Sequence, residues 1–131
     1  MKYMFSAQFH PIEDGSGYYA RVPDLPGCIT TGKTLEDAIE QITDAASIWL
    51  VVAEDDDKDI PVATEQSKLK GPKGSVFSLI RIDTLEYRAL TDTRAVRKNV
   101  SLPAWMAKLA DKRKINCSKI LQDGLMLELN K

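Results

Sequence analysis

The last 38 residues of the chain, 94–131, constrain its fold most, because they hold too few residues to bury a core alone. From Val96 to Leu102 the even positions are apolar except for Lys98, and the odd positions are polar, which is the period of a strand. Two helical patterns follow, one opened by Pro103 and one by Asn116, a good N-cap residue. Below about 40 residues a chain rarely folds without a disulfide, a metal or a second subunit. We therefore expect this module to be half of a structure.

Neither a disulfide nor a metal is expected to supply the missing stability. The two cysteines, Cys28 and Cys117, lie far apart in different predicted modules, and we expect two buried free thiols. The single histidine, His10, cannot complete a zinc site by itself. The sequence therefore predicts no metal and no cofactor, and a second copy of the chain is the expected source of stability.

A lone strand leaves its backbone donors and acceptors unpaired, and antiparallel pairing with the same strand of a second chain would satisfy them. The result is a two-stranded ribbon over four helices, with the apolar side chains between them. The predicted dimer core consists of Val100, Leu102, Trp105, Leu109, Ile120 and Leu121.

Such a ribbon fits the major groove of DNA, and its exposed face would present Arg97, Asn99 and Ser101 from each chain. Arginine pairs with guanine and asparagine with adenine, so these three are the base-reading candidates. The N-terminus of the second helix offers backbone N–H groups to a phosphate. The phosphate-contacting candidates there are Asn116, Cys117, Ser118 and Lys119.

The charge distribution agrees with a polyanionic partner for the tail. The net charge of the chain is −1, but residues 1–93 carry 9 basic and 16 acidic side chains, whereas residues 94–131 carry 9 basic and 3 acidic ones. An acidic body joined to a basic tail favours nucleic-acid contact by the tail.

The body reads as one small α+β domain. Alternation predicts a half-buried strand over residues 2–10, and a turn at "PIEDGSG" leads to a returning strand at "YYARV". A rigid "PDLPGC" loop precedes a third strand near "CITTG", and Thr34 with Asp37 opens a long amphipathic helix. That helix is expected to fray at "EDDDKD", and "SVFSLIRI" reads as a strand covered on both faces. The order is β-β-β-α-β.

Three segments follow from these patterns: a body over residues 1–83, a linker over 84–95 that holds a short helix or turn, and the strand–helix–helix module over 96–131. No apolar run approaches the roughly 20 residues that span a bilayer. The N-terminus alternates instead of forming a signal-peptide core, so we expect a cytoplasmic protein with no membrane contact.

These residues resemble a known family. The stretch "RKNVSLPAWMAKLADKRKINCSKILQDGLMLEL" is similar to a ribbon–helix–helix DNA-binding domain, and "GSGYYARVPDLPGCITTGKTLEDAIEQITDAASIWL" resembles the HicB antitoxins. The resemblance implies a type II toxin–antitoxin pair, with a partly degenerate RNase H-like body that binds and blocks a HicA-type mRNA interferase toxin. It also implies that the C-terminal module binds operator double-stranded DNA as a homodimer and represses the operon. The resemblance assigns no individual body residue to toxin contact, and a second contact through the bodies would give a tetramer.

Two alternatives remain at the level of sequence. A metal-dependent RNase H-like nuclease needs several carboxylates that hold two divalent ions. The first strand contains no Asp or Glu, and no Ser/His/Asp arrangement exists, so we expect no enzymatic activity. The other alternative is a stand-alone ribbon–helix–helix repressor without a toxin partner.

Overall fold

The computed structural model describes residues 1–131, and the chain divides into two compact units, residues 2–91 and residues 92–131. The larger unit contains the strands β1 (Lys2–Pro11), β2 (Tyr18–Arg21), β3 (Ile29–Gly32) and β4 (Val76–Asp83). Its helices are α1 (Leu35–Asp55), the short 3-10 turn η1 (Gln66–Lys68) and α2 (Thr84–Thr91). The predicted α+β class and the order β-β-β-α-β are confirmed.

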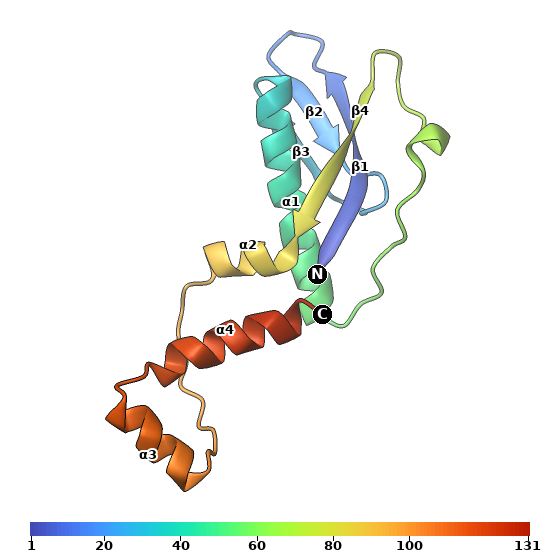
Figure 1. Cartoon of the computed structure of the whole chain (residues 1–131). Coiled ribbons are helices and arrows are strands. Elements are labelled where there is room, and N and C mark those ends of the chain that lie inside the picture. Colours follow the sequence, from blue (N-terminus) through green and yellow to red (C-terminus); the bar gives the residue numbers. More distant parts are fainter. The chain divides into compact units, whose positions relative to one another are not determined.

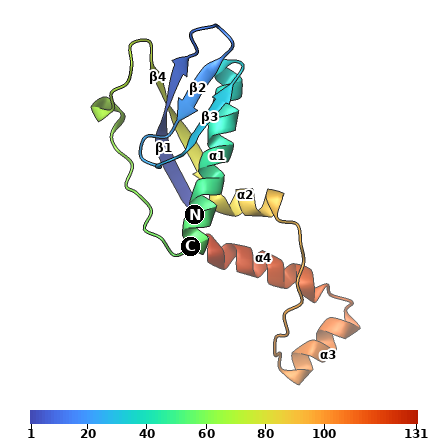
Figure 2. The ribbon, with the colours of Figure 1, turned by 180° about the vertical axis from the view of Figure 1, so that it is seen from behind.

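The four strands form one antiparallel sheet in the order β3-β2-β1-β4, and α1 runs along it (Figures 1 and 2). The core lies between α1 and the sheet. From β1 it receives Phe5, Ala7 and Phe9, each at most 2% exposed, as the alternation predicts. The helix contributes the apolar stripe that includes Ala38, Ile42, Ala46 and Leu50.

The local signals at the turns and at the start of α1 are confirmed. The Thr34 hydroxyl accepts a hydrogen bond from the Asp37 N–H (3.0 Å), while the Asp37 carboxylate accepts one from the Lys33 N–H (2.9 Å). Gly32 packs against the first turn of α1, and a Cβ there would overlap the backbone of Ala38. The helix can therefore approach β3 this closely only because residue 32 has no side chain.

Two predictions about the sheet were wrong. β4 is not covered on both faces: Ile80 and Ile82 are buried against α1, but Leu79 on the opposite face is 57% exposed, because β4 is an edge strand of a sheet with a helix on one side only. Conversely, β1 is more than half buried, since Ser6 and Gln8 on the outer face are also covered.

The long connection between α1 and β4 explains the burial of Gln8. Gly71 lies so close to the Gln8 amide that a Cβ at residue 71 would overlap it, and Ser75 accepts a hydrogen bond from Gln8 Nε2 (3.2 Å). The same connection is held to the loop after β2, where the Asp24 carboxylate accepts hydrogen bonds from the Thr64 N–H (2.8 Å) and hydroxyl (2.6 Å).

The segment predicted as a linker, residues 84–95, is helical over its first eight residues. This helix, α2, packs on α1 through Arg88, which contacts Glu54 (3.1 Å) and Asp55 (2.9 Å). The boundary between the two units accordingly falls after Thr91.

The smaller unit consists of an extended segment, residues 92–103, followed by α3 (Ala104–Lys112) and α4 (Cys117–Leu129). No strand is formed over residues 96–102 in the single chain, because a strand needs a hydrogen-bonded neighbour and none is available there. No residue of this unit is buried. Cys117 is exposed, so the expected burial of both thiols is wrong for it, whereas Cys28 is buried.

Candidate nucleic-acid interface

The candidate interface begins with the extended segment of the smaller unit. Its even-numbered residues Lys98, Val100 and Leu102 line a hollow of about 390 Å³ formed with α3 and α4. The base-reading candidates Arg97, Asn99 and Ser101 do not line it and are exposed. The segment therefore keeps the two-faced pattern of a strand although no second strand is paired with it.

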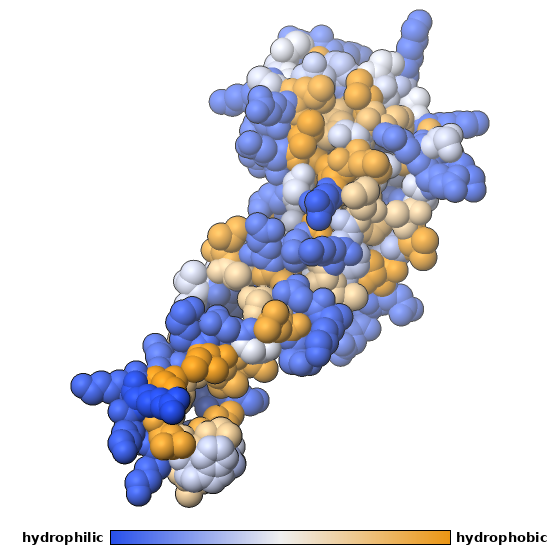
Figure 3. Space-filling model, viewed as in Figure 1, coloured by the Kyte–Doolittle hydropathy of each residue, from blue (hydrophilic) through white to orange (hydrophobic).

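The rest of this hollow is predominantly apolar. Met106 and Ala110 of α3 and Ile120 and Leu121 of α4 contribute to it, together with Ile115 from the turn between the helices. Side chains of this kind stand at the surface of both helices (Figure 3). The six predicted dimer-core residues are between 38% and 63% exposed: Val100, Leu102, Trp105, Leu109, Ile120 and Leu121. One copy of the module thus has an apolar face and no core.

The N-terminus of α4 is built as its sequence indicates. Asn116 is the N-cap, and its Oδ1 accepts a hydrogen bond from the Lys119 N–H (3.1 Å). The N–H groups at the first positions of a helix have no partner within the helix, and Cys117 and Ser118 occupy those positions. The helix dipole places partial positive charge there, so a phosphate oxygen is a suitable ligand.

The Lys119 ammonium has a carboxylate partner within α4. Its Nζ lies 3.5 Å from Asp123 Oδ2, one turn further along α4. Both side chains are largely exposed, and exposed pairs of this kind contribute at most about 1 kcal/mol. The lysine can therefore exchange this carboxylate for a phosphate at little cost.

The acidic end of α1 is only partly free for contact with a partner. Glu54 accepts hydrogen bonds from the Tyr3 hydroxyl (2.7 Å), the Thr84 hydroxyl (3.0 Å) and Arg88 (3.1 Å). Burial alone would raise the pKa of Glu54, but these three donors together lower it. Burial and the contact with Glu54 raise the pKa of Tyr3 to about 12. Glu54 is thus a structural hub that joins β1, α1 and α2.

The remaining carboxylates show no metal-binding arrangement. No group of three or more His, Cys, Asp or Glu side chains is placed to hold a metal ion. No helix combines the length and the apolar character needed to cross a membrane.

Comparison with known proteins defines the class. The family model of the HicB-like antitoxins of bacterial toxin–antitoxin systems matches residues 5–122. This match spans both units of the structure and most of the chain, and the chain therefore belongs to the HicB-like antitoxin family.

Solved structures share the fold of the chain, and a curated relative shares part of its sequence. The antitoxin HicB of Burkholderia pseudomallei is 25% identical, with a TM-score of 0.56 over 94% of this chain and 96% of that one. A toxin–antitoxin complex from Streptococcus pneumoniae contains a chain of the same fold, with 20% identity and a TM-score of 0.63 over 98% of this chain and 99% of that one. A UPF0150 protein of Synechocystis is 32% identical over 62 residues, which is 47% of this chain and 84% of the relative.

Proposed function

We propose that the chain is an antitoxin that binds and neutralises a HicA-type mRNA interferase toxin through its N-terminal body and represses its own operon through its C-terminal module. The module would be a ribbon–helix–helix that pairs with a second copy and binds operator DNA. The body would be a non-catalytic, RNase H-like domain, and the protein would act in the cytoplasm without a cofactor. Family membership supports the antitoxin role.

One observation carries the DNA-binding half of the proposal: the module exposes every large apolar side chain that it possesses. Val100, Leu102 and Trp105 are 54%, 48% and 63% exposed in a single chain, although each is at the position where the pattern places the dimer core. Complete burial of a fully exposed side chain of this kind contributes roughly 1.5–3 kcal/mol, so a second copy that covers the exposed part of each would be a strong source of stability. Pairing of residues 96–102 would also satisfy the backbone groups that the single chain leaves open.

In this dimer the polar side of the segment would face outward from the ribbon. Arg97, Asn99 and Ser101 would read base edges in the major groove, whereas the N-terminus of α4 would hold a phosphate and fix the register. The basic tail supplies the sequence-independent attraction to DNA.

The test is fluorescence anisotropy with the DNA upstream of the chain's own gene and with a permuted duplex of the same composition. The wild-type chain is expected to prefer the upstream DNA. Arg97→Ala should lose roughly 1–3 kcal/mol of binding free energy and relax the preference at one base pair in each half-site. Arg94→Ala is the matched control, because Arg94 lies outside the predicted strand and pairs with Asp92 (2.9 Å); it should retain the operator preference.

An Arg97→Ala chain with an unchanged operator preference would contradict the ribbon assignment. The toxin half is tested by co-expression with the small reading frame beside the gene, where the chain should restore growth. If the chain restores growth but does not bind the operator, it is an antitoxin and not a repressor. If it binds the operator but does not restore growth, it is a stand-alone repressor. Cleavage of RNA by the purified chain with Mg²⁺ or Mn²⁺ would support the nuclease alternative instead.

A further inference from the structure

The sheet face opposite α1 carries a set of polar and aromatic side chains that are joined in part by hydrogen bonds. Gln8 on β1 is held from two sides, by Ser75 and by Arg21, whose Nε donates a hydrogen bond to Gln8 Oε1 (2.9 Å). Gln8 and Arg21 are cross-strand partners, and the neighbouring pair along the same strands is His10 and Tyr19. All four side chains therefore lie on one patch of the outer face.

This patch borders a hollow of about 320 Å³. The hollow is mainly apolar but contains a few polar groups that converge on it, which is the usual composition of a binding site. Six of the residues that line it are Gln8, His10, Tyr19, Arg21, Ile29 and Pro72.

Two polar groups at the hollow lack partners. His10 Nδ1 is buried and makes no hydrogen bond. Arg21 uses only its Nε, toward Gln8, and its two terminal nitrogens form no ion pair or hydrogen bond. Because the Arg21 side chain is exposed, an acceptor from outside the chain can reach these two nitrogens. The Gln8 contact also fixes the direction of the Arg21 guanidinium in advance.

The charge around the hollow indicates what that outside group is. No Asp or Glu lines it, and Lys70 and Lys73 flank Pro72 in the covering loop. A guanidinium with two free nitrogens matches a carboxylate in a two-point hydrogen bond. Tyr19 and Ile29 beside it are each more than half exposed and offer apolar surface to a partner.

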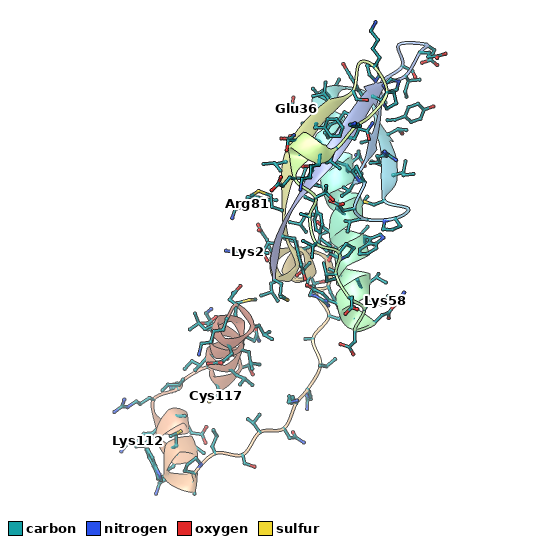
Figure 4. The ribbon with its side chains drawn as sticks, turned by 90° about the vertical axis from the view of Figure 1, so that its right-hand side faces the viewer. Lys2, Glu36, Lys58, Arg81, Lys112 and Cys117 are labelled. Carbon is teal, nitrogen blue, oxygen red and sulfur yellow. The ribbon has the colours of Figure 1, made fainter.

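The apolar surface extends beyond the hollow. On the same face, Met4 of β1 and Leu79 of β4 are each about half exposed. Arg81 lies on this side of the sheet together with Lys2, whereas Lys58 projects from the opposite side of the unit (Figure 4). An apolar centre with a cationic border is larger than a small anion needs and fits a protein surface.

We propose that this hollow is where the toxin binds, with a carboxylate side chain of the toxin paired to Arg21 and an adjacent apolar side chain packed on Tyr19 and Ile29. The inference rests on the proposed antitoxin function and adds the location and chemistry of the contact. The carboxylate accepts hydrogen bonds from the two terminal nitrogens of the Arg21 guanidinium.

The experiment measures the affinity of the full-length chain for the toxin encoded beside its gene, by isothermal titration calorimetry. Arg21→Gln and Ile29→Asp should each weaken toxin binding by about tenfold or more, and Arg21→Lys should weaken it less, because it keeps the charge and loses the two-point geometry. Lys58→Gln is the matched control, which removes a cation from the opposite side of the unit and should leave the affinity within about twofold. Operator binding by each variant reports that the chain is folded and should be unchanged.

Wild-type affinity in both Arg21→Gln and Ile29→Asp would overturn this location while leaving the antitoxin function intact. A wild-type chain that binds no toxin would instead overturn both proposals. The affinity of the same variants for single-stranded RNA is measured by titration, and their molar mass in solution is measured by sedimentation equilibrium. If these variants retain toxin affinity but lose RNA binding or self-association, the hollow binds RNA or a second copy of the chain, and the proposal is wrong.

Discussion

At the scale of single residues, Glu54 shows how one carboxylate can join three elements. Its donors come from β1, from the start of α2 and from Arg88 near the middle of α2. These contacts span 51, 30 and 34 positions in sequence, so no local pattern indicates them. The "EDDDKD" run reads as a solvated turn, and only the fold separates Glu54 from its exposed neighbours.

Replacement of Glu54 by Gln is therefore expected to destabilise the larger unit. Loss of the charged acceptor should lower the free energy of unfolding by about 1–3 kcal/mol near neutral pH. Because the folded state lowers the pKa of Glu54 below its ordinary 4.5, this stability is present above 4.5 and is lost as pH falls through the lower folded value. The difference between wild type and variant should accordingly shrink in acid.

Urea unfolding at neutral and acid pH measures both effects. Glu40→Gln, on the exposed side of α1, is the control and should change stability little at either pH. A Glu54→Gln chain as stable as the Glu40→Gln chain at neutral pH would show that the contacts of Glu54 contribute nothing to the free energy of unfolding.

Lys119 permits a second prediction at this scale. If its ammonium leaves Asp123 for a phosphate, Lys119→Ala should weaken binding to operator and to permuted DNA alike, and it should flatten the salt dependence by about one unit of slope per module. Lys131→Ala removes a similar exposed pair, with Glu128 (2.9 Å), at the other end of α4 and should change neither. A loss of affinity confined to the operator would be incompatible with a phosphate contact.

At the scale of elements, helix caps were predictable because they depend on neighbours in sequence. Thr34 and Asn116 each accept a hydrogen bond from the N–H three residues further along. Thr34→Ala should cost about 1 kcal/mol of stability, whereas Thr34→Ser, which retains the hydroxyl, should cost much less. Equal stability of the Thr34→Ala and Thr34→Ser variants in urea unfolding would show that the Thr34 cap does not stabilise the larger unit.

The periodicity of a strand predicts which of its faces is apolar, but it does not predict what covers the other face. Alternation identified the core face of β1, because Phe5, Ala7 and Phe9 differ from their neighbours in polarity. It did not identify the burial of Gln8 or the exposure of Leu79. These depend on the path of the connection between α1 and β4, and on the position of β4 at the sheet edge, which are long-range properties. The hollow beside Arg21 was not predicted either, because it also depends on the path of this connection, which contributes Pro72 to its lining.

At the scale of the whole molecule, the two units differ in what they lack. The larger unit has its own core, between α1 and the sheet. The smaller unit, residues 92–131, has two helices, of which α4 has a side-chain N-cap, but no buried residue. A core in one unit and an uncovered apolar face in the other agree with the proposed assignment of toxin binding to the larger unit and DNA binding to the smaller one.

Self-association of the full-length chain tests the central claim most directly. Sedimentation equilibrium at micromolar concentration should give a mass of at least two chains for the wild type, and Val100→Asp, which places a charge in the predicted dimer core, should reduce that association. A wild-type chain that remains a folded monomer at these concentrations would contradict the claim that residues 96–131 are completed by a second copy.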